Sequence, residues 1–199
     1  MAIIESYKLS HWNYFLAVEE DLHRLSRFIE FSTENFDTHS LELARILFAA
    51  SAEVDVVAKQ LCERIIPGCR VSKMNGYGDL LSRQLPILGE THVTIPRHGL
   101  TFQPWTNLQQ GSPPDWWRAY NEVKHHRHER YRSANLKHAL NAVSGLFLLL
   151  LFFYKLDATS GGLKPNPSLF RLGDPLGDDT LFWDSSKAFV YRLDRNSLL

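Results

Sequence analysis

The chain has 199 residues, of which 44% are apolar and 22% charged, enough for one domain with a substantial hydrophobic core. Its 22 Lys and Arg residues balance its 22 Asp and Glu residues, so net charge gives no argument for binding to nucleic acid or to a membrane surface. Cys62 and Cys69 are too few for a disulfide framework and indicate buried thiols in a reducing compartment. The N-terminus lacks the cationic start and apolar block of a signal peptide. We therefore expect a cytoplasmic protein with a single domain over residues 1–199.

The first third of the chain predicts two helices. The first begins near Ser10, a residue type that favours the N-cap position. Its apolar side chains recur at alternating spacings of three and four: Phe15, Val18, Leu22, Leu25 and Ile29. The second begins at about 37–40 and runs to about Ile65, before Pro67-Gly68. Its apolar ladder, the strongest helical signal in the sequence, comprises Leu43, Ile46, Ala50, Val54, Val57 and Leu61.

The next segment has weaker signals. A short helix is predicted at about 78–84. Residues 91–107 then alternate, are rich in β-branched side chains and carry Pro-Arg-His-Gly at their middle. This pattern is typical of an irregular β-hairpin or a long loop, so we expect a non-helical insert at about 88–111 between the helices.

A third helix is predicted after Ser112-Pro113-Pro114-Asp115, ending near 130–132. Ser112 can cap it, proline is favoured at the first helical position, and the Asp115 carboxylate suits the positive end of the helix dipole. Wound at about 100° per residue, the helix separates packing residues from chemically capable ones. One side carries Trp116, Ala119, Tyr120 and Val123. The other carries what we call the polar stripe, spaced i, i+3, i+7 and i+10: Arg118, Asn121, His125 and His128.

Ser133 can cap a fourth helix that is apolar all round in its second half. The apolar run over 145–154 is shorter than the roughly 18 residues that suggest a membrane span, so it predicts a buried central helix and no membrane contact. Residues 163–199 contain several prolines and glycines, and the runs 180–183 and 188–193 favour a small hairpin without a core of its own.

These elements together predict a mainly α protein. We expect an antiparallel four-helix bundle over about 8–156, with the inserted β-hairpin or loop at about 88–111. A short β-rich C-terminal appendage at about 163–199 would pack on this bundle.

The polar stripe combines groups that suit the binding and cleavage of a phosphodiester. Arg118 can neutralise a phosphate and bind it with two hydrogen bonds. His125 can exchange a proton with a ribose 2′-hydroxyl or a leaving oxygen near neutral pH, while Asn121 can bond the phosphate or fix the imidazole. This chemistry requires no metal or other cofactor. A local cationic patch extends the stripe and can hold the flanking backbone: Lys124, Arg127 and Arg130.

Arg118-x6-His125 and the segment Tyr120-Asn121-Glu122-Val123-Lys124-His125 resemble the motif of the HEPN superfamily. These proteins are helical bundles with an Arg-x(4–6)-His motif at the start of a late helix, often with Asn, Asp or His directly after the arginine. Many members are metal-independent ribonucleases of toxin–antitoxin, phage-defence and CRISPR systems, and others bind nucleotides or RNA without cutting. The motif usually lies at a homodimer interface. The resemblance covers about 8–156 and implies a homodimer, an RNA or nucleotide ligand and an antitoxin or other protein partner.

Two alignments with this motif compete. In the first, Arg118 is the motif arginine. In the second, Tyr120 takes the arginine position, which keeps Asn121 and His125 in register but loses the catalytic cation, so that Arg118, Lys124 or Arg127 must replace it. The resemblance therefore implies a metal-independent endoribonuclease with His125 as general acid and base, Arg118 on the phosphate and Asn121 orienting it. The RNA contacts would come from Lys124, Arg127, His128, Arg130 and Tyr120. The alternative is a non-catalytic binding or dimerisation module.

Other interpretations of these residues are open at this point. The histidines over 125–128 also suit a solvated helix end, where cations are favoured. His125 and His128 lie one turn apart and can share a zinc ion with a distant histidine, but the paired-ligand spacings of structural zinc sites are missing, so we predict no metal. Trp116 and Trp117 can stack on bases, although such a pair more often anchors a helix start in the core.

Overall fold

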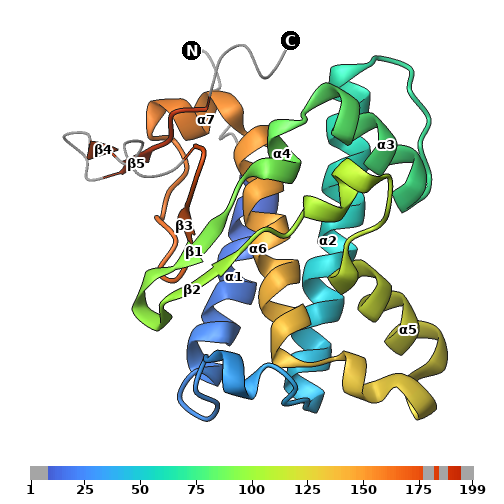
Figure 1. Ribbon diagram of the computed structural model, residues 1–199. Coiled ribbons are helices and arrows are strands. Elements are labelled where there is room, and N and C mark those ends of the chain that lie inside the picture. Colours follow the sequence, from blue (N-terminus) through green and yellow to red (C-terminus); the bar gives the residue numbers. More distant parts are fainter. Residues whose placement is uncertain (1–8, 177–181, 184–187, 194–199) are drawn as a thin grey trace, which may run out of the picture.

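The computed structural model describes residues 9–176, 182–183 and 188–193. These residues form a mainly helical structure with a small three-stranded antiparallel sheet on one side (Figure 1). Helices α1 (Ser10–Leu25), α2 (Leu41–Ile65), α5 (Asp115–Arg130) and α6 (Leu136–Phe153) supply most of the helical core. Three shorter helices complete the set: α3 (Met74–Gln84), α4 (Ile87–Glu90) and α7 (Lys155–Ser160). The predicted short helix is thus present, but it begins at Met74 rather than Gly78.

The central pair of helices is α2 and α6, which make the most extensive helix contact in the described part of the chain. At one end the backbone N–H of Leu136 donates to the carbonyl of Thr38 (2.9 Å), just before both helices begin. At the other end Arg64 Nη1 donates to the carbonyl of Phe153 (2.8 Å), where both helices finish. The two helices therefore run parallel, a consequence of their being second and fourth in an up-and-down order.

Helix α1 runs antiparallel to α2, and α5 runs antiparallel to α6. His11 and Asp21 of α1 contact Glu53 and Arg45 of α2, so the residue numbers run in opposite directions along the pair. In the same way, Trp116 at the start of α5 lies against Gly145 in the middle of α6, and the remainder of α5 runs back toward the start of α6. The parallel direction of α2 and α6 agrees with this order, because alternate helices of an up-and-down arrangement point the same way.

Helices α2 and α6 begin where a polar side chain accepts a free backbone N–H group. Ser40 caps α2 by accepting the N–H of Leu43 (3.1 Å), and the helix begins directly after the predicted range of 37–40. Helix α6 is capped by Asn135, whose Oδ1 accepts the N–H of His138 (3.0 Å). The prediction that Ser133 caps this helix is wrong, because Ser133 lies in a 3-10 turn ahead of it.

The predicted caps of the first and third helices are also wrong. The residue before α1 is Leu9, and Ser10 is already helical. The residue before α5 is Pro114, so neither Ser112 nor a helical proline begins the helix. Pro114 instead accepts backbone bonds through its carbonyl from the N–H groups of Trp117 (3.0 Å) and Arg118 (3.1 Å).

The insert forms the predicted hairpin, from β1 (Val93–Ile95) and β2 (Leu100–Phe102), with Ile95 opposite Leu100. Gly99 closes its turn at a φ of 62°, a left-handed conformation that glycine adopts without steric cost. Strand β3 (Arg171–Leu172) comes from the C-terminal segment and pairs with β1, which places β1 in the middle of the sheet. This third strand was not predicted.

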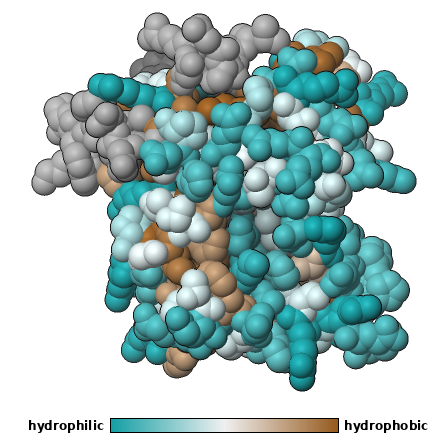
Figure 2. All heavy atoms as spheres, in the orientation of Figure 1, coloured by the Kyte–Doolittle hydropathy of each residue, from teal (hydrophilic) through white to brown (hydrophobic). Residues whose placement is uncertain are grey.

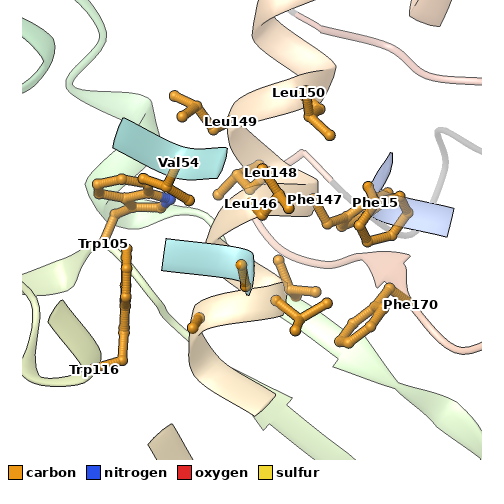
Figure 3. Close-up of a cluster of buried hydrophobic side chains, with 14 of the residues drawn as sticks. Phe15, Val54, Trp105, Trp116, Leu146, Phe147, Leu148, Leu149, Leu150 and Phe170 are labelled. Carbon is orange, nitrogen blue, oxygen red and sulfur yellow. The ribbon is translucent and has the colours of Figure 1, made fainter. Parts of the chain in front are cut away.

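The core is built around α6, in which the whole stretch from Ala142 to Phe153 is buried. By length and composition α6 is apolar enough to cross a membrane, yet 83% of its apolar window is buried inside the fold, as in the core helix of a soluble protein. Figure 3 shows two aromatic groups on either side of it. Phe15 and Phe170 stack on Phe147 (5.5 and 6.2 Å between ring centroids), and Trp105 meets Trp116 edge to face.

The C-terminal segment packs on this core as an appendage. Glu19 of α1 is buried, and its carboxylate accepts the backbone N–H groups of Ser168 (2.9 Å), Leu169 (2.8 Å) and Phe170 (3.1 Å). Further along, β4 (Phe182–Trp183) and β5 (Phe189–Val190) pair antiparallel, as predicted for a tail hairpin. Residues 180–181 and 184–187 of that predicted hairpin lie outside the described residues.

Candidate functional site

The inward side of α5 anchors the helix in the core. The four residues predicted for this side are all buried: Trp116, Ala119, Tyr120 and Val123. Trp116 Nε1 donates to the carbonyl of Pro104 (2.8 Å), so the polar atom of this indole is satisfied inside the protein. The glycine at 145 on α6 leaves room for the indole, because a Cβ added there would lie 3.1 Å from Trp116 Cζ2. This packing fixes which side of α5 faces outward.

Three residues of the polar stripe line one pocket of about 470 Å³, which we call the Arg118 pocket. Its lining consists of Asn75, Pro113, Trp117, Arg118, Asn121, Glu122, His125 and His126. The helical spacing therefore brings Arg118, Asn121 and His125 to the lining of a common cavity. Three further α5 residues line the pocket, of which Trp117 adds an aromatic surface and Glu122 a carboxylate.

A second pocket of about 550 Å³ lies on the other flank of the same residues, and we call it the Lys73 pocket. Its lining consists of Asp55, Ser72, Lys73, Met74, Asn75, Trp117, Tyr120, Asn121, Lys124 and His125. The two pockets share Asn75, Trp117, Asn121 and His125. These four residues therefore form a wall that a ligand can reach from both sides.

The polar groups of the Arg118 pocket have partners of their own. Arg118 Nη2 donates to Asp115 Oδ1 one turn earlier, and both side chains remain more than half exposed (58% and 56%). An exposed ion pair of this kind contributes little to stability, so a phosphate can compete with Asp115 for the guanidinium. Asn121 Nδ2 donates to the carbonyl of Trp117 (3.1 Å), which holds the carboxamide against the shared wall.

Two tyrosine rings pack against Trp117. It meets Tyr77 of α3 edge to face (6.2 Å between centroids) and tilts against Tyr120 (5.2 Å). Tyr77 donates its hydroxyl hydrogen to Asp55 (3.1 Å), which is also ion-paired with Lys59. Burial, and then the charge of Asp55, raise the pKa of Tyr77, so the phenol stays protonated and keeps donating this bond. Asp55 of α2 therefore positions Tyr77 of α3, and Tyr77 in turn packs against Trp117 of α5, one of the four shared residues.

The polar stripe ends at His125. His126 has φ −133° and ψ 40°, which is not helical, and α5 kinks at this residue. His128 is consequently turned away from the Arg118 pocket and lies with Leu41, Arg127 and Tyr131 around a separate cavity of about 680 Å³. The prediction that His128 belongs to the stripe is wrong for this physical reason.

The predicted RNA-contacting residues lie in three different places. Tyr120 is buried, with its ring edge-on to Phe48, and lines the Lys73 pocket. Lys124 lines that pocket too, with Nζ 5.3 Å from the Tyr120 ring centroid. Arg127 lies beyond the kink, over Tyr131 (5.3 Å), and Arg130 is exposed at the end of α5. Figure 2 shows hydrophilic residues covering this region of the molecule.

Sequence reasoning missed the contribution of the segment that begins α3. Lys73 and Asn75 line the site, although residues 66–75 show no helical or strand periodicity that would place them. The only available signals were the Pro67-Gly68 break and the cation itself, and neither indicates that this segment folds against α5.

Cysteine and metal chemistry have little support in the described part of the chain. Cys62 and Cys69 are both free. Cys62 is buried, and this burial raises the pKa of its thiol to about 12, so the thiolate needed for nucleophilic attack is scarce near neutral pH. Among the described residues, His, Cys, Asp and Glu side chains form no group of three or more placed to hold a metal ion.

Comparison of the chain with known proteins gave no match to a protein-family model, to a curated protein or to a solved structure.

Proposed function

We propose that this protein acts on RNA at the pocketed side of α5, as a HEPN-like, metal-independent endoribonuclease of the cytoplasm. The observation that carries the proposal is the meeting of Arg118, Asn121 and His125 in one pocket. These three side chains supply a cation, a hydrogen-bonding amide and a proton-transfer group, which are the elements needed for cleaving a phosphodiester beside a ribose 2′-hydroxyl.

In this proposal each residue has one role. His125 takes the proton of the 2′-hydroxyl or returns one to the leaving oxygen. Arg118 exchanges Asp115 for a phosphate oxygen, and the negative charge that develops in the transition state strengthens that contact. Asn121 holds the phosphate or the imidazole in place. Lys124 binds the neighbouring backbone.

The fold and the resemblance together suggest a dimeric arrangement. The four main helices follow an up-and-down order, and the motif helix α5 precedes the most buried helix, as in the HEPN superfamily. We propose that two copies meet across the exposed side of α5 and that a toxin–antitoxin or phage-defence partner controls the assembly. Two residues of the stripe stay accessible for such a contact, because Arg118 and His125 are exposed.

The test compares two histidines of the same helix. Purified protein should degrade single-stranded RNA in the presence of EDTA, and His125→Ala should reduce the rate by about 100-fold to 10,000-fold, the usual contribution of a general acid or base. His128→Ala is the matched control and should cleave at the wild-type rate, because His128 faces the separate cavity beyond the kink. Equal rates for the wild type and His125→Ala would reject the catalytic role.

A second candidate function is a non-catalytic module that binds RNA or a partner protein through the same surface. Two observations favour it: Arg118 is already paired with Asp115, and Tyr120, which occupies the motif arginine position in one alignment, is buried. Such a module would retain RNA in a salt-dependent manner and yield no cleavage products. A dimer that ignores RNA altogether would instead indicate a protein-interaction role.

A further inference from the structure

The Arg118 pocket and the Lys73 pocket differ in the chemistry they present. Beside Arg118, which the proposed function places on the scissile phosphate, the Arg118 pocket offers the apolar surfaces of Trp117 and Pro113, with the Asn75 and Asn121 amides and the Glu122 carboxylate as hydrogen-bonding groups. Glu122 already accepts a hydrogen bond from Ser133 Oγ (2.6 Å), which holds its carboxylate in place. An apolar surface with a few polar groups at its edge suits a nucleobase, whose faces stack and whose edge forms hydrogen bonds.

The Lys73 pocket presents two ammonium groups from different elements. Lys73 stands directly before α3, and Lys124 comes from α5. The one carboxylate of this pocket, Asp55, is compensated by its ion pair with Lys59 and by the hydrogen bond from Tyr77. The two lysines therefore leave a local excess of positive charge, which suits a phosphate.

Because the two pockets share a wall of Asn75, Trp117, Asn121 and His125, a single ligand can occupy both at once. We infer that the Lys73 pocket is a second phosphate subsite and that the ligand is a single-stranded RNA segment of at least two nucleotides. One base enters the Arg118 pocket, and the adjoining backbone phosphate lies between Lys73 and Lys124. This inference rests on the proposed action on RNA and names the form of RNA that the site takes.

The single-stranded form follows from the shape of the site. A paired and stacked base inside a duplex presents no free face or Watson–Crick edge, so it cannot enter a pocket beside Trp117. Cavities of about 470 and 550 Å³ are within the size range of small-ligand sites and accommodate splayed nucleotides rather than a helix.

The experiment measures binding of a fluorescein-labelled single-stranded oligouridine by fluorescence anisotropy over a series of salt concentrations. A His125→Ala background prevents cleavage of the probe. Lys73→Ala should weaken binding several-fold and reduce the slope of log K against log salt by about 0.7, the value of one phosphate contact on a single strand. Arg70→Ala is the matched control, because it removes one exposed cation from the same segment outside both pockets and should leave the slope unchanged.

Competition with an RNA duplex of the same length completes the test. Unlabelled single strand should displace the probe, and the duplex should not. Equal slopes for Lys73→Ala and Arg70→Ala, or equal displacement by duplex and single strand, would overturn the inference while leaving the proposed function in place. An absence of RNA binding and RNA cleavage by the wild-type protein would instead overturn the proposed function itself.

Discussion

The two parts of α5 on either side of His126 differ in how they are packed, although the sequence predicts one continuous helix. The first part, from Asp115 to His125, alternates buried and exposed residues and is fixed against α6 by Trp116. The second part, from Arg127 to Arg130, is exposed at every residue. Polar residues on a helix therefore keep facing one way only along the part of the helix whose opposite side is packed in the core.

The largest expected difference between the two parts is in stability. Trp116→Ala should lower the free energy of unfolding by about 3–5 kcal/mol, because it leaves a large cavity in the core and removes the indole bond to Pro104. Arg127→Ala, in the second part, should change it by no more than about 0.5 kcal/mol. Urea unfolding followed by circular dichroism measures both, and similar losses would contradict the comparison.

A smaller effect should follow from crowding the same anchor. Gly145→Ala would place a Cβ 3.1 Å from Trp116 Cζ2 and 3.5 Å from Pro104 Cβ. Such overpacking usually costs about 1–3 kcal/mol. Asn141→Ala, one turn earlier on α6 and only partly buried, is the control and should be near neutral. Thermal unfolding of both variants would show the difference, and a neutral Gly145→Ala would mean that the contact with α5 is loose.

The second part of α5 is followed by a short connection to α6, residues 131–135, which contributes less to stability than the Trp116 anchor. Asn135→Ala should cost about 1 kcal/mol, because it leaves the N–H of His138 without its cap. Ser133→Ala should cost less, since it removes only an exposed bond to Glu122. Chemical unfolding measures the free energy of unfolding of the two variants. A larger loss for Ser133→Ala than for Asn135→Ala would indicate that Ser133, the cap predicted from the sequence, caps α6.

The smallest expected effect is a pH dependence of stability that comes from His138, in the first turn of α6. Burial lowers the pKa of His138, and its ring nitrogen Nδ1 lies 2.9 Å from the Ser133 carbonyl, with Lys137, Asp115 and Glu122 as the charges around it. The unfolded chain therefore binds a proton at a higher pH than the folded chain. Stability from this group is complete above the unfolded pKa of about 6.5 and decreases as the pH falls below it.

The control for this pH effect is His138→Gln, which cannot titrate. Unfolding midpoints of the wild type and the variant, measured on both sides of a pH of about 6.5, should diverge on the acid side only. Parallel curves for the two proteins would show that the pH dependence originates at other histidines.

Much of the helical core could be predicted because its signal is periodic. The ladder from Leu43 to Leu61 is buried along α2, and the apolar run in α6 forms the central helix. The insert was predicted from the Pro-Arg-His-Gly turn, and the structure confirms that hairpin. These features depend on neighbours within a few residues, which a sequence displays directly.

The features that escaped prediction depend on distant partners. Strand β3 pairs with β1 across almost eighty residues of chain, with Val93 opposite Leu172, and no local pattern identifies such a partner. Lys73 reaches the site because α3 packs against α2 and presents its start toward α5. The kink at His126 was missed as well, since its neighbours read as a continuous helix. The placement of Arg118, Asn121 and His125 in one pocket could be predicted because all three precede that kink.

The bonds between Glu19 and the segment from Ser168 to Phe170 have a consequence for how the chain is made. The donors lie 149 to 151 residues beyond the carboxylate they satisfy. During synthesis, which proceeds from the N-terminus, the first helix is complete long before those donors leave the ribosome. Because a carboxylate is costly to bury without partners, we expect the part of α1 around Glu19 to dock fully only after this segment has been made.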